Sequence, residues 1–131
     1  MGERSGGVTT PGELSRRYIE FHNSYDLDGL LSLVDDSISF KRAEEEPLVG
    51  AEAVRRQYLE GWDGHEGVVV TVRRIVEPES TAAVEIHVES GPPSNVQYDG
   101  VVVHDWSSDG RLVRYRLYVD EVLPSSEPDH I

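Results

Sequence analysis

The sequence predicts an α+β fold, a conical α+β barrel with three N-terminal helices packed on a strongly curved, mostly antiparallel sheet. Up to residue 62, apolar side chains recur mainly at helical spacing, whereas from residue 67 they alternate as in strands. The turn-forming stretches "EPES", "SGPPSN" and "SSDG" separate four alternating runs. Helices followed by an antiparallel meander are typical of the α+β class. The space that a curved sheet leaves around its helices is an ordinary site for a small apolar ligand.

Three helices are expected in the first 62 residues. Thr10 is the predicted N-cap of the first, because Pro11 takes the first helical position and Glu13 lies three residues beyond the cap. Asp26 is expected to cap a second, short helix, and "GAEAVRRQYLEGW" forms the third. The expected buried stripes are Leu14, Tyr18, Phe21, His22 and Tyr25, then Leu27, Leu30, Leu31 and Val34, and finally Val54, Tyr58 and Trp62.

The strands are predicted from alternation. "SISFKR" is expected to be a strand with Ile38, Phe40 and Arg42 on one face, followed by the loop "AEEEPLVG". The four later strands are "GVVVTVRRIV", "TAAVEIHVES", "VQYDGVVVHDW" and "RLVRYRLYVDEVL". A chain of 131 residues corresponds to one domain, expected at 10–123, with a flexible N-terminal arm at 1–9 and a flexible C-terminal tail at 124–131.

Composition argues against several classes of function. The net charge of −13, from 25 acidic and 12 basic residues, repels phosphate backbones and anionic membranes, so no nucleic acid and no membrane are expected as partners. There is no cysteine and the histidines lack metal-ligand spacing, so no metal site is predicted. No cofactor is expected, because phosphate-binding glycine loops and dinucleotide motifs are absent from the sequence. The first residues contain no apolar signal core, and a cytoplasmic protein is expected.

Three stretches carry a family resemblance: "RYIEFHNSYDLDGLLSLVDDSISF", "PLVGAEAVRRQY" and "DGRLVRYRLYVD". They resemble the nuclear transport factor 2-like superfamily, which contains ketosteroid isomerases and SnoaL-like polyketide cyclases. The resemblance covers residues 10–123 and implies a SnoaL-like domain with the conical fold. Because that fold hosts isomerases, cyclases, epoxide hydrolases, dehydratases and binding modules, the fold does not specify a reaction.

The resemblance implies a mixed set of catalytic residues. Tyr18 lies where ketosteroid isomerases keep the tyrosine that donates to the substrate oxyanion. Their catalytic aspartate corresponds to Arg42 or Lys41 here, and their second oxyanion donor falls on Val102, so the usual isomerase route is not expected. The SnoaL-like cyclases are more similar, because they place a pocket-facing histidine where His104 lies.

Other enzymes of the superfamily use a carboxylate on the last strand. The water-activating aspartate of limonene epoxide hydrolases falls on Leu117, and the partner aspartate of the cyclases has no direct counterpart. Asp120 lies nearest to it, beside Tyr118. The acid–base pair implied by the resemblance is therefore incomplete, with Asp120 as the carboxylate to check.

Alternation predicts that His104 points inward. In "YDGVVVHDW", His104 shares a face with Val102 and Trp106. In the last strand, the face that contains Tyr115 and Leu117 is the more apolar, and pairing across "SSDG" brings it toward His104. A bulge or a shift by one residue would reverse this placement.

The expected site combines a few polar groups with an apolar lining. The candidate catalytic groups are His104 as general base, Tyr18 and Arg42 as oxyanion donors, and Asp120. An imidazole suits the role of base because it titrates near neutrality. The residues expected to contact the substrate are His22, Phe40, Tyr58, Trp62, Ile86, Val88, Val102, Trp106, Tyr115, Leu117 and Val119.

Structural interpretations of the same residues stay open. Tyr18 also fits a helix aromatic packed on the sheet, and His22 fits a hydrogen-bonded core residue. Arg42 fits a rim residue that pairs with the glutamates of "AEEEP".

Two hypotheses about function follow. The first is a SnoaL-like enzyme that performs cofactor-free acid/base chemistry (enolisation, isomerisation or cyclisation) on a hydrophobic carbonyl substrate in an apolar pocket. The alternative is a non-catalytic ligand-binding or dimerisation module of the same fold, or else an epoxide hydrolase or epoxide-opening cyclase. Whether the protein is an enzyme stays open at this point. The expected partners are a small hydrophobic molecule and a second copy of the chain, forming a homodimer through the outer sheet face.

Overall fold

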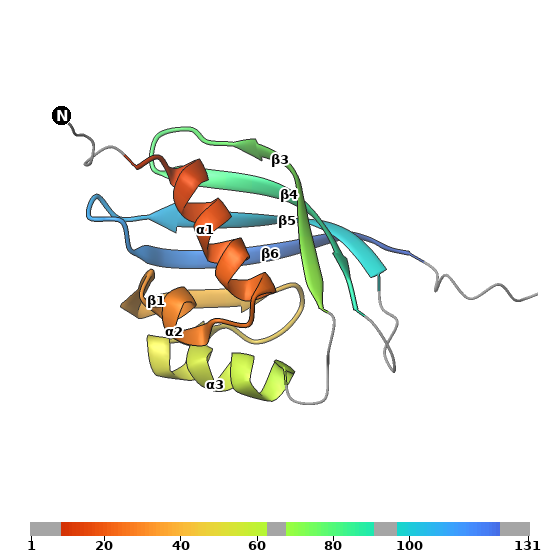
Figure 1. Ribbon diagram of the computed structural model, residues 1–131, viewed down its shortest axis with the longest axis horizontal. Helices are drawn as coiled ribbons and strands as arrows, with labels where there is room; N and C mark the ends of the chain where they lie inside the picture. The colour runs from red at the N-terminus through yellow and green to blue at the C-terminus, as the bar shows by residue number, and fades with distance from the viewer. Residues whose placement is uncertain (1–8, 63–67, 91–96, 124–131) are drawn as a thin grey trace, which may run out of the picture.

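A single layer of helices covers one side of a curled sheet (Figure 1). The computed structural model describes residues 9–62, 68–90 and 97–123. The predicted arm at 1–9, except its last residue, the tail at 124–131 and most of the turn "SGPPSN" lie outside the described residues.

The helices are α1 (Pro11–Asn23), α2 (Leu27–Leu31) and α3 (Ala51–Trp62). The predicted capping box is confirmed. The Thr10 side chain accepts from the Glu13 backbone N–H at 3.1 Å, and the Glu13 carboxylate accepts from the Thr10 N–H at 2.9 Å. Asp26 caps α2 by accepting from the Gly29 N–H at 2.9 Å. Local hydrogen bonds therefore define where α1 and α2 begin. None of the described helices is long and apolar enough to cross a membrane.

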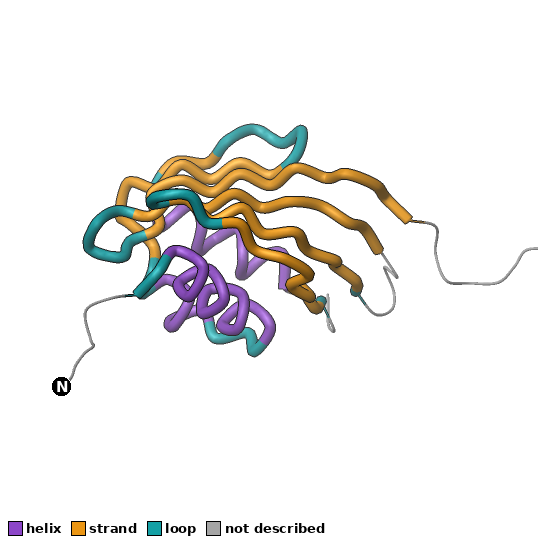
Figure 2. Tube along the Cα trace, turned by 90° about the horizontal axis from the view of Figure 1, so that it is seen from above, coloured by secondary structure: helices purple, strands orange, loops and turns teal. Residues whose placement is uncertain are grey.

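Within the described residues, six strands form the sheet, in the order β2-β1-β6-β5-β4-β3. All neighbours pair antiparallel except β1 and β6, which are parallel. The expected curved, mostly antiparallel sheet is thus confirmed, with a sheet that curls over the helices rather than closing (Figure 2). The strands are β1 (Val34–Arg42), β2 (Leu48–Val49), β3 (Val69–Val76), β4 (Thr81–Glu89), β5 (Gln97–Trp106) and β6 (Leu112–Leu123).

The pairing is interrupted where the sheet bends. One extra residue enters the pairing at Arg73 in β3, at Val113 in β6 and at Asp120 in β6. Bulges of this kind bend a strand and increase its twist. Opposite the last bulge, a side chain on Gly100 would lie 2.5 Å from the Tyr118 carbonyl oxygen, so β5 and β6 approach closely at that point.

Two predictions around the first strand are wrong. Val34, expected on a helix stripe, is the first residue of β1, because it pairs with Leu112 of β6. The stretch "AEEEPLVG", expected to be a loop, contains β2, which pairs with β1. Gly50 makes this return possible, since its φ of 101° suits glycine and its N–H bonds the Ile38 carbonyl at 2.8 Å.

The two sheet faces differ in chemistry. Alternate residues of β4 and β5 are buried on the concave face, which packs on the helices. The opposite face carries ion pairs, such as Arg116 with Asp105 at 3.3 Å and Arg73 with Asp99 at 3.7 Å. The homodimer through this face stays a prediction.

Gly100→Ala should destabilise the fold, because the added methyl group would overlap the Tyr118 carbonyl oxygen. Overpacking of this kind costs about 1–3 kcal/mol of unfolding free energy, which urea denaturation would measure. Gly61→Ala is the matched control. Gly61 lies in α3, where an added methyl group would meet only open space, and alanine favours a helix by about 0.5–1 kcal/mol. Equal stability of both variants would contradict the close approach of β5 and β6.

Candidate functional site

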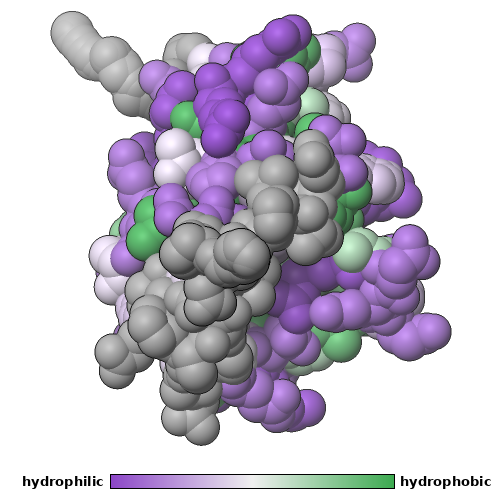
Figure 3. Space-filling model, turned by 90° about the vertical axis from the view of Figure 1, so that its right-hand side faces the viewer, coloured by the Kyte–Doolittle hydropathy of each residue, from purple (hydrophilic) through white to green (hydrophobic). Residues whose placement is uncertain are grey.

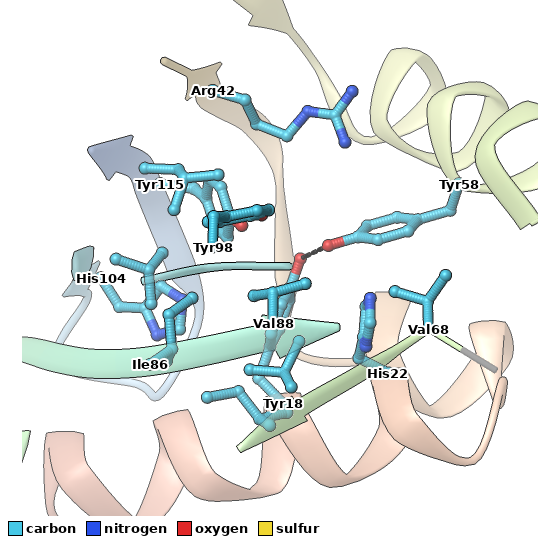
Figure 4. Close-up of a pocket in the computed structure, with 14 residues that line it drawn as sticks. Tyr18, His22, Arg42, Tyr58, Val68, Ile86, Val88, Tyr98, His104 and Tyr115 are labelled. Atoms are coloured by element: carbon cyan, nitrogen blue, oxygen red, sulfur yellow. Dashed lines mark hydrogen bonds between the residues drawn. The ribbon is translucent and has the colours of Figure 1, made fainter. Parts of the chain in front are cut away.

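A cavity of about 120 Å³ lies between α1, α3 and the concave sheet face (Figure 4). A cavity of roughly 150 Å³ holds a benzene-sized molecule, so this one is near the size of a single ring. Several of its lining residues, including His22, Arg42 and Tyr58, also line a wider hollow of about 500 Å³. At the end of the molecule that faces the viewer in Figure 3, the visible described surface is mostly hydrophilic.

Most of the residues expected in a pocket line this cavity. Those expected and found there are Tyr18, His22, Arg42, Tyr58, Ile86, Val88, Val102, His104, Tyr115 and Leu117. The inward placement predicted for His104 is confirmed, because its side chain is fully buried and pairs opposite Tyr115. Alternation and the pairing across "SSDG" were sufficient to predict it.

Four residues expected to contact the substrate lie outside the cavity. Phe40 is buried behind it and stacks on Tyr115, with ring centroids 4.1 Å apart. Trp62 lines the wider hollow rather than the inner cavity. Trp106 is buried where its indole bonds Ser15, and Val119 packs partly buried against the core. Phe40 packs against a ring that lines the cavity, Tyr115, and the Trp106 indole bonds a residue of α1 that is absent from the lining, Ser15.

Asp120, the candidate catalytic carboxylate to check, does not line the cavity. It is exposed, at the bulge in β6. Among the described residues that line the cavity there is no carboxylate. Asp120 therefore takes no part in the candidate site.

Several site residues were not expected from the sequence. Ile19, Val68, Val70 and Tyr98 also line the cavity. Tyr98 lies an even number of residues before His104 in the same strand, so alternation places both side chains on one face and could have predicted Tyr98. The valines could not be found in this way, because "GVVVTV" offers no contrast between its two faces.

Buried Ser15 is the hydrogen-bond partner of His104. The Ser15 Oγ lies 2.7 Å from His104 Nδ1 and 3.1 Å from the Trp106 indole nitrogen. The only signal for it in the sequence is spacing, since Ser15 precedes Tyr18 by three residues and His22 by seven, which places all three on one helix face.

His104 is neutral in this environment. The rings of Tyr18, Tyr115 and Trp106 surround it, with centroids 5.2, 5.4 and 5.9 Å away. Burial lowers the pKa of His104 to about 3, because the imidazolium form would lose its hydration. Within the described part of the chain, its Nε2 has no hydrogen-bond partner. A ligand atom that reaches Nε2 would satisfy a buried polar group.

Two tyrosines meet across the cavity. The hydroxyl groups of Tyr18, on α1, and Tyr58, on α3, lie 2.7 Å apart (Figure 4). Burial raises the pKa of Tyr18 well above its usual value and raises that of Tyr58 to about 12. Both hydroxyls are therefore protonated near neutral pH, and one of the two protons remains to be donated to a ligand.

His22 stands at the outer end of the cavity, between Tyr58 and Val68 (Figure 4). Its Nδ1 lies 3.2 Å from the Asn23 Oδ1. The Asn23 amide in turn bonds the Val70 backbone, accepting from its N–H at 2.9 Å and donating to its carbonyl at 2.8 Å. Burial lowers the pKa of His22. Both cavity histidines are thus held by a bond to one ring nitrogen.

Arg42 combines both interpretations given to it. It lines the cavity, and its guanidinium pairs with Glu45 at 3.1 Å, as expected for the glutamates of "AEEEP". Among the described residues, no group of three or more histidine, aspartate or glutamate side chains could hold a metal ion.

Burial of His104 should make the fold sensitive to acid. The unfolded state binds a proton near pH 6.5, whereas the folded state resists it until about pH 3. The unfolding free energy should therefore fall as pH drops from 6.5, by about 1.4 kcal/mol per pH unit from this residue. Urea denaturation at several pH values should show a shallower dependence of the unfolding free energy on pH in His104→Gln than in the unchanged protein. An NMR titration in which His104 protonates near pH 6.5 would contradict the prediction.

Known proteins share this fold. A family model described as the SnoaL-like domain matches residues 15–115. A candidate ketosteroid isomerase from Kribbella flavida is 21% identical, with 92% of this chain and 82% of that chain covered and a TM-score of 0.71. A limonene-epoxide-hydrolase-like (LEH-like) epoxide hydrolase of M. tuberculosis is 16% identical, with 84% and 82% covered and a TM-score of 0.73.

A third similar structure is the epoxide hydrolase/cyclase-like enzyme SalBIII, which has a role in pyran ring formation in polyether salinomycin. It is 15% identical, with 84% of this chain and 90% of that chain covered and a TM-score of 0.75. No curated protein matches the chain in sequence. The solved structures have the same architecture. Since the family model spans most of the domain, the chain belongs to the SnoaL-like domain family.

Proposed function

We propose that the protein is an enzyme that performs cofactor-free proton transfer on a small hydrophobic substrate with a carbonyl group, leading to isomerisation or cyclisation. The observation that carries this proposal is the hydrogen-bonded Tyr18–Tyr58 pair in a cavity that two imidazoles also line. Neutral donors and neutral bases, placed together in a dry and mostly aromatic or aliphatic space, suit the chemistry of an enolate.

In the proposed reaction, a base removes a proton from the carbon next to the carbonyl. The C–H electron pair forms the new C=C bond, and the carbonyl π electrons move to the oxygen as negative charge. The hydroxyl of Tyr18 or Tyr58 donates a hydrogen bond to that oxygen, in a site where little water screens the interaction. In an isomerisation, a C=C bond next to that carbon makes the intermediate a dienolate, which takes up the proton at its far carbon. In a cyclisation, the enolate carbon attacks a second carbonyl, and the oxygen of that carbonyl takes up the proton.

The base in this proposal is an imidazole. The described lining of the cavity contains no carboxylate, so His104 and His22 are the candidates for proton abstraction. The positive charge of Arg42 lies near the tyrosines and favours a negatively charged enolate oxygen bound to their hydroxyl groups. The pairing of Arg42 with Glu45 weakens that effect. The aliphatic part of the lining, which includes Ile86 and Val88, favours an apolar substrate body.

The alternatives differ in what they require. An epoxide hydrolase or epoxide-opening cyclase, as named for two of the similar structures, typically needs a group that activates water, and no carboxylate is available in the described lining. A non-catalytic binding module needs only the apolar cavity. Such a module would give the negative outcome of the following test.

Tyr18→Phe should slow the reaction about 10²–10³-fold, the usual effect of removing one oxyanion donor. The assay is exchange of the protons next to the carbonyl for deuterium, followed by ¹H NMR in D₂O, with a panel of monocyclic and polycyclic ketones and enones. Tyr118→Phe is the matched control, because Tyr118 is 53% exposed and lies on the outer sheet face, so its rate should equal that of the unchanged protein.

Two results would reject the proposed function. One is an exchange rate equal to that of the control in the double variant Tyr18→Phe/Tyr58→Phe, which removes both hydroxyls. The other is a ketone that perturbs the NMR signals of the cavity residues, yet is recovered without deuterium from every reaction. The second result would identify a binding module.

A further inference from the structure

The hydrogen bonds around the two cavity histidines select different ring nitrogens for the proton. A neutral imidazole carries one N–H donor and one acceptor nitrogen, and the partner of one nitrogen determines the role of the other. His22 and His104 each have one partnered nitrogen, Nδ1 in both rings. The nature of that partner differs between them.

At His22 the partner can only accept. The Val70 backbone fixes the Asn23 amide, because its N–H requires an oxygen and its carbonyl requires an N–H. The oxygen of Asn23 is therefore the atom that lies 3.2 Å from His22 Nδ1. Because that oxygen accepts, Nδ1 carries the proton, and Nε2 of His22 presents a lone pair.

At His104 the partner donates. The Trp106 indole can only donate, so it occupies a lone pair of the Ser15 oxygen. Within the described residues, the bonds of the Ser15 side chain are those to Trp106 and His104, so the hydroxyl proton points to His104 Nδ1. Nδ1 of His104 is therefore the acceptor, and Nε2 carries the proton.

We infer that His22 is the general base of the site and His104 a neutral hydrogen-bond donor to the substrate, with Asn23 and Ser15 as the positioning residues that set these roles. The catalytic part rests on the proposed function, whereas the tautomers follow from the contacts alone. The inference reverses the sequence-based expectation, which gave the role of base to His104.

The positions along the cavity agree with this division. Ser15, Tyr18 and His22 lie on one face of α1, and a rise of 1.5 Å per residue separates Ser15 from His22 by about 10 Å. His104 is fully buried at the Ser15 end, whereas His22 also lines the wider outer hollow. A substrate carbonyl at the Tyr18–Tyr58 pair would therefore have a donor on its inner side and a base on its outer side.

The proton balance closes within these groups. Nε2 of His22 takes the proton from the carbon next to the carbonyl, and the resulting imidazolium keeps its Nδ1–H bond to Asn23. The tyrosine pair and the His104 Nε2–H donate to the enolate oxygen without releasing their protons. His22 then returns its proton, to the far carbon of the dienolate in an isomerisation or to the new alkoxide oxygen in a ring closure, which restores the neutral imidazole.

Burial of His22 favours its neutral, basic form. Arg42 faces it from β1, paired with Glu45, and Tyr58 and Tyr98 face it from α3 and β5. Burial and the positive charge of Arg42 lower the pKa of His22, while the bond to Asn23 raises it. His22 is therefore an available base near neutral pH, and the rate should fall in acid as it becomes protonated.

Two-bond ¹H–¹⁵N NMR spectra of the histidine rings test the tautomers without any substrate. The expected result is a protonated Nδ1 in His22 and a protonated Nε2 in His104. Ser15→Ala removes the donor to His104 Nδ1, so the proton of His104 should no longer be confined to Nε2. The His22 signals should stay unchanged. A protonated Nδ1 in His104, or an unprotonated Nδ1 in His22, would overturn the inference.

Kinetics test the base. His22→Gln should lower the rate of deuterium exchange by about 10²–10⁴-fold, and His87→Gln, altered on the outer sheet face, should not. Asn23→Asp should move the acid limb of the pH–rate profile to higher pH, because a carboxylate beside His22 raises its pKa. A merely structural change would lower the rate without moving that limb.

The outcomes separate the two proposals. An inactive His104→Gln together with a fully active His22→Gln would return the role of base to His104 and overturn the inference. Absence of exchange with every ketone would reject the proposed function and the base role together, while the NMR spectra would still decide the tautomers.

Discussion

A buried hydrogen-bonded chain, Trp106–Ser15–His104, joins α1 to β5 at the inner end of the cavity. Buried polar groups without partners cost about 1–3 kcal/mol each, so this chain restricts how α1 can rotate and slide on the sheet. Once Ser15 is placed, helix geometry places Tyr18 and His22 along the same face. The placement of the site residues on α1 relative to β5 follows from this one contact between distant parts of the chain.

Burial shifts the pKa of the cavity histidines and that of the cavity tyrosines in opposite directions, and both shifts have the same physical cause. Low polarity disfavours any charged form, so it lowers the pKa of His104 and raises the pKa of Tyr18 and Tyr58. The inner site therefore consists of neutral donors and acceptors. The net charge of −13 resides elsewhere, and Arg42 contributes the charge nearest to the tyrosines, already paired with Glu45.

Membership of the SnoaL-like family explains the shape of the cavity but not its chemistry. At the positions where the resemblance would place catalytic carboxylates, this chain has Arg42, Val102 and Leu117. All three line the cavity, so these substitutions change its interior directly. An imidazole on α1 as base offers a consistent way for the same fold to perform proton transfer without those carboxylates.

The sequence by itself determined the fold class, the starts of α1 and α2, and the inward faces that carry Tyr18, Tyr58 and His104. These features are local, because capping residues and the periods of helices and strands are written in neighbouring positions. Only the tertiary structure decided the partners. Ser15 meets His104 from 89 positions away and Asn23 meets Val70 from 47, and no pattern in the sequence signals either contact. Periodicity reports which face is buried, whereas a hydrogen bond depends on what the packing places across from it.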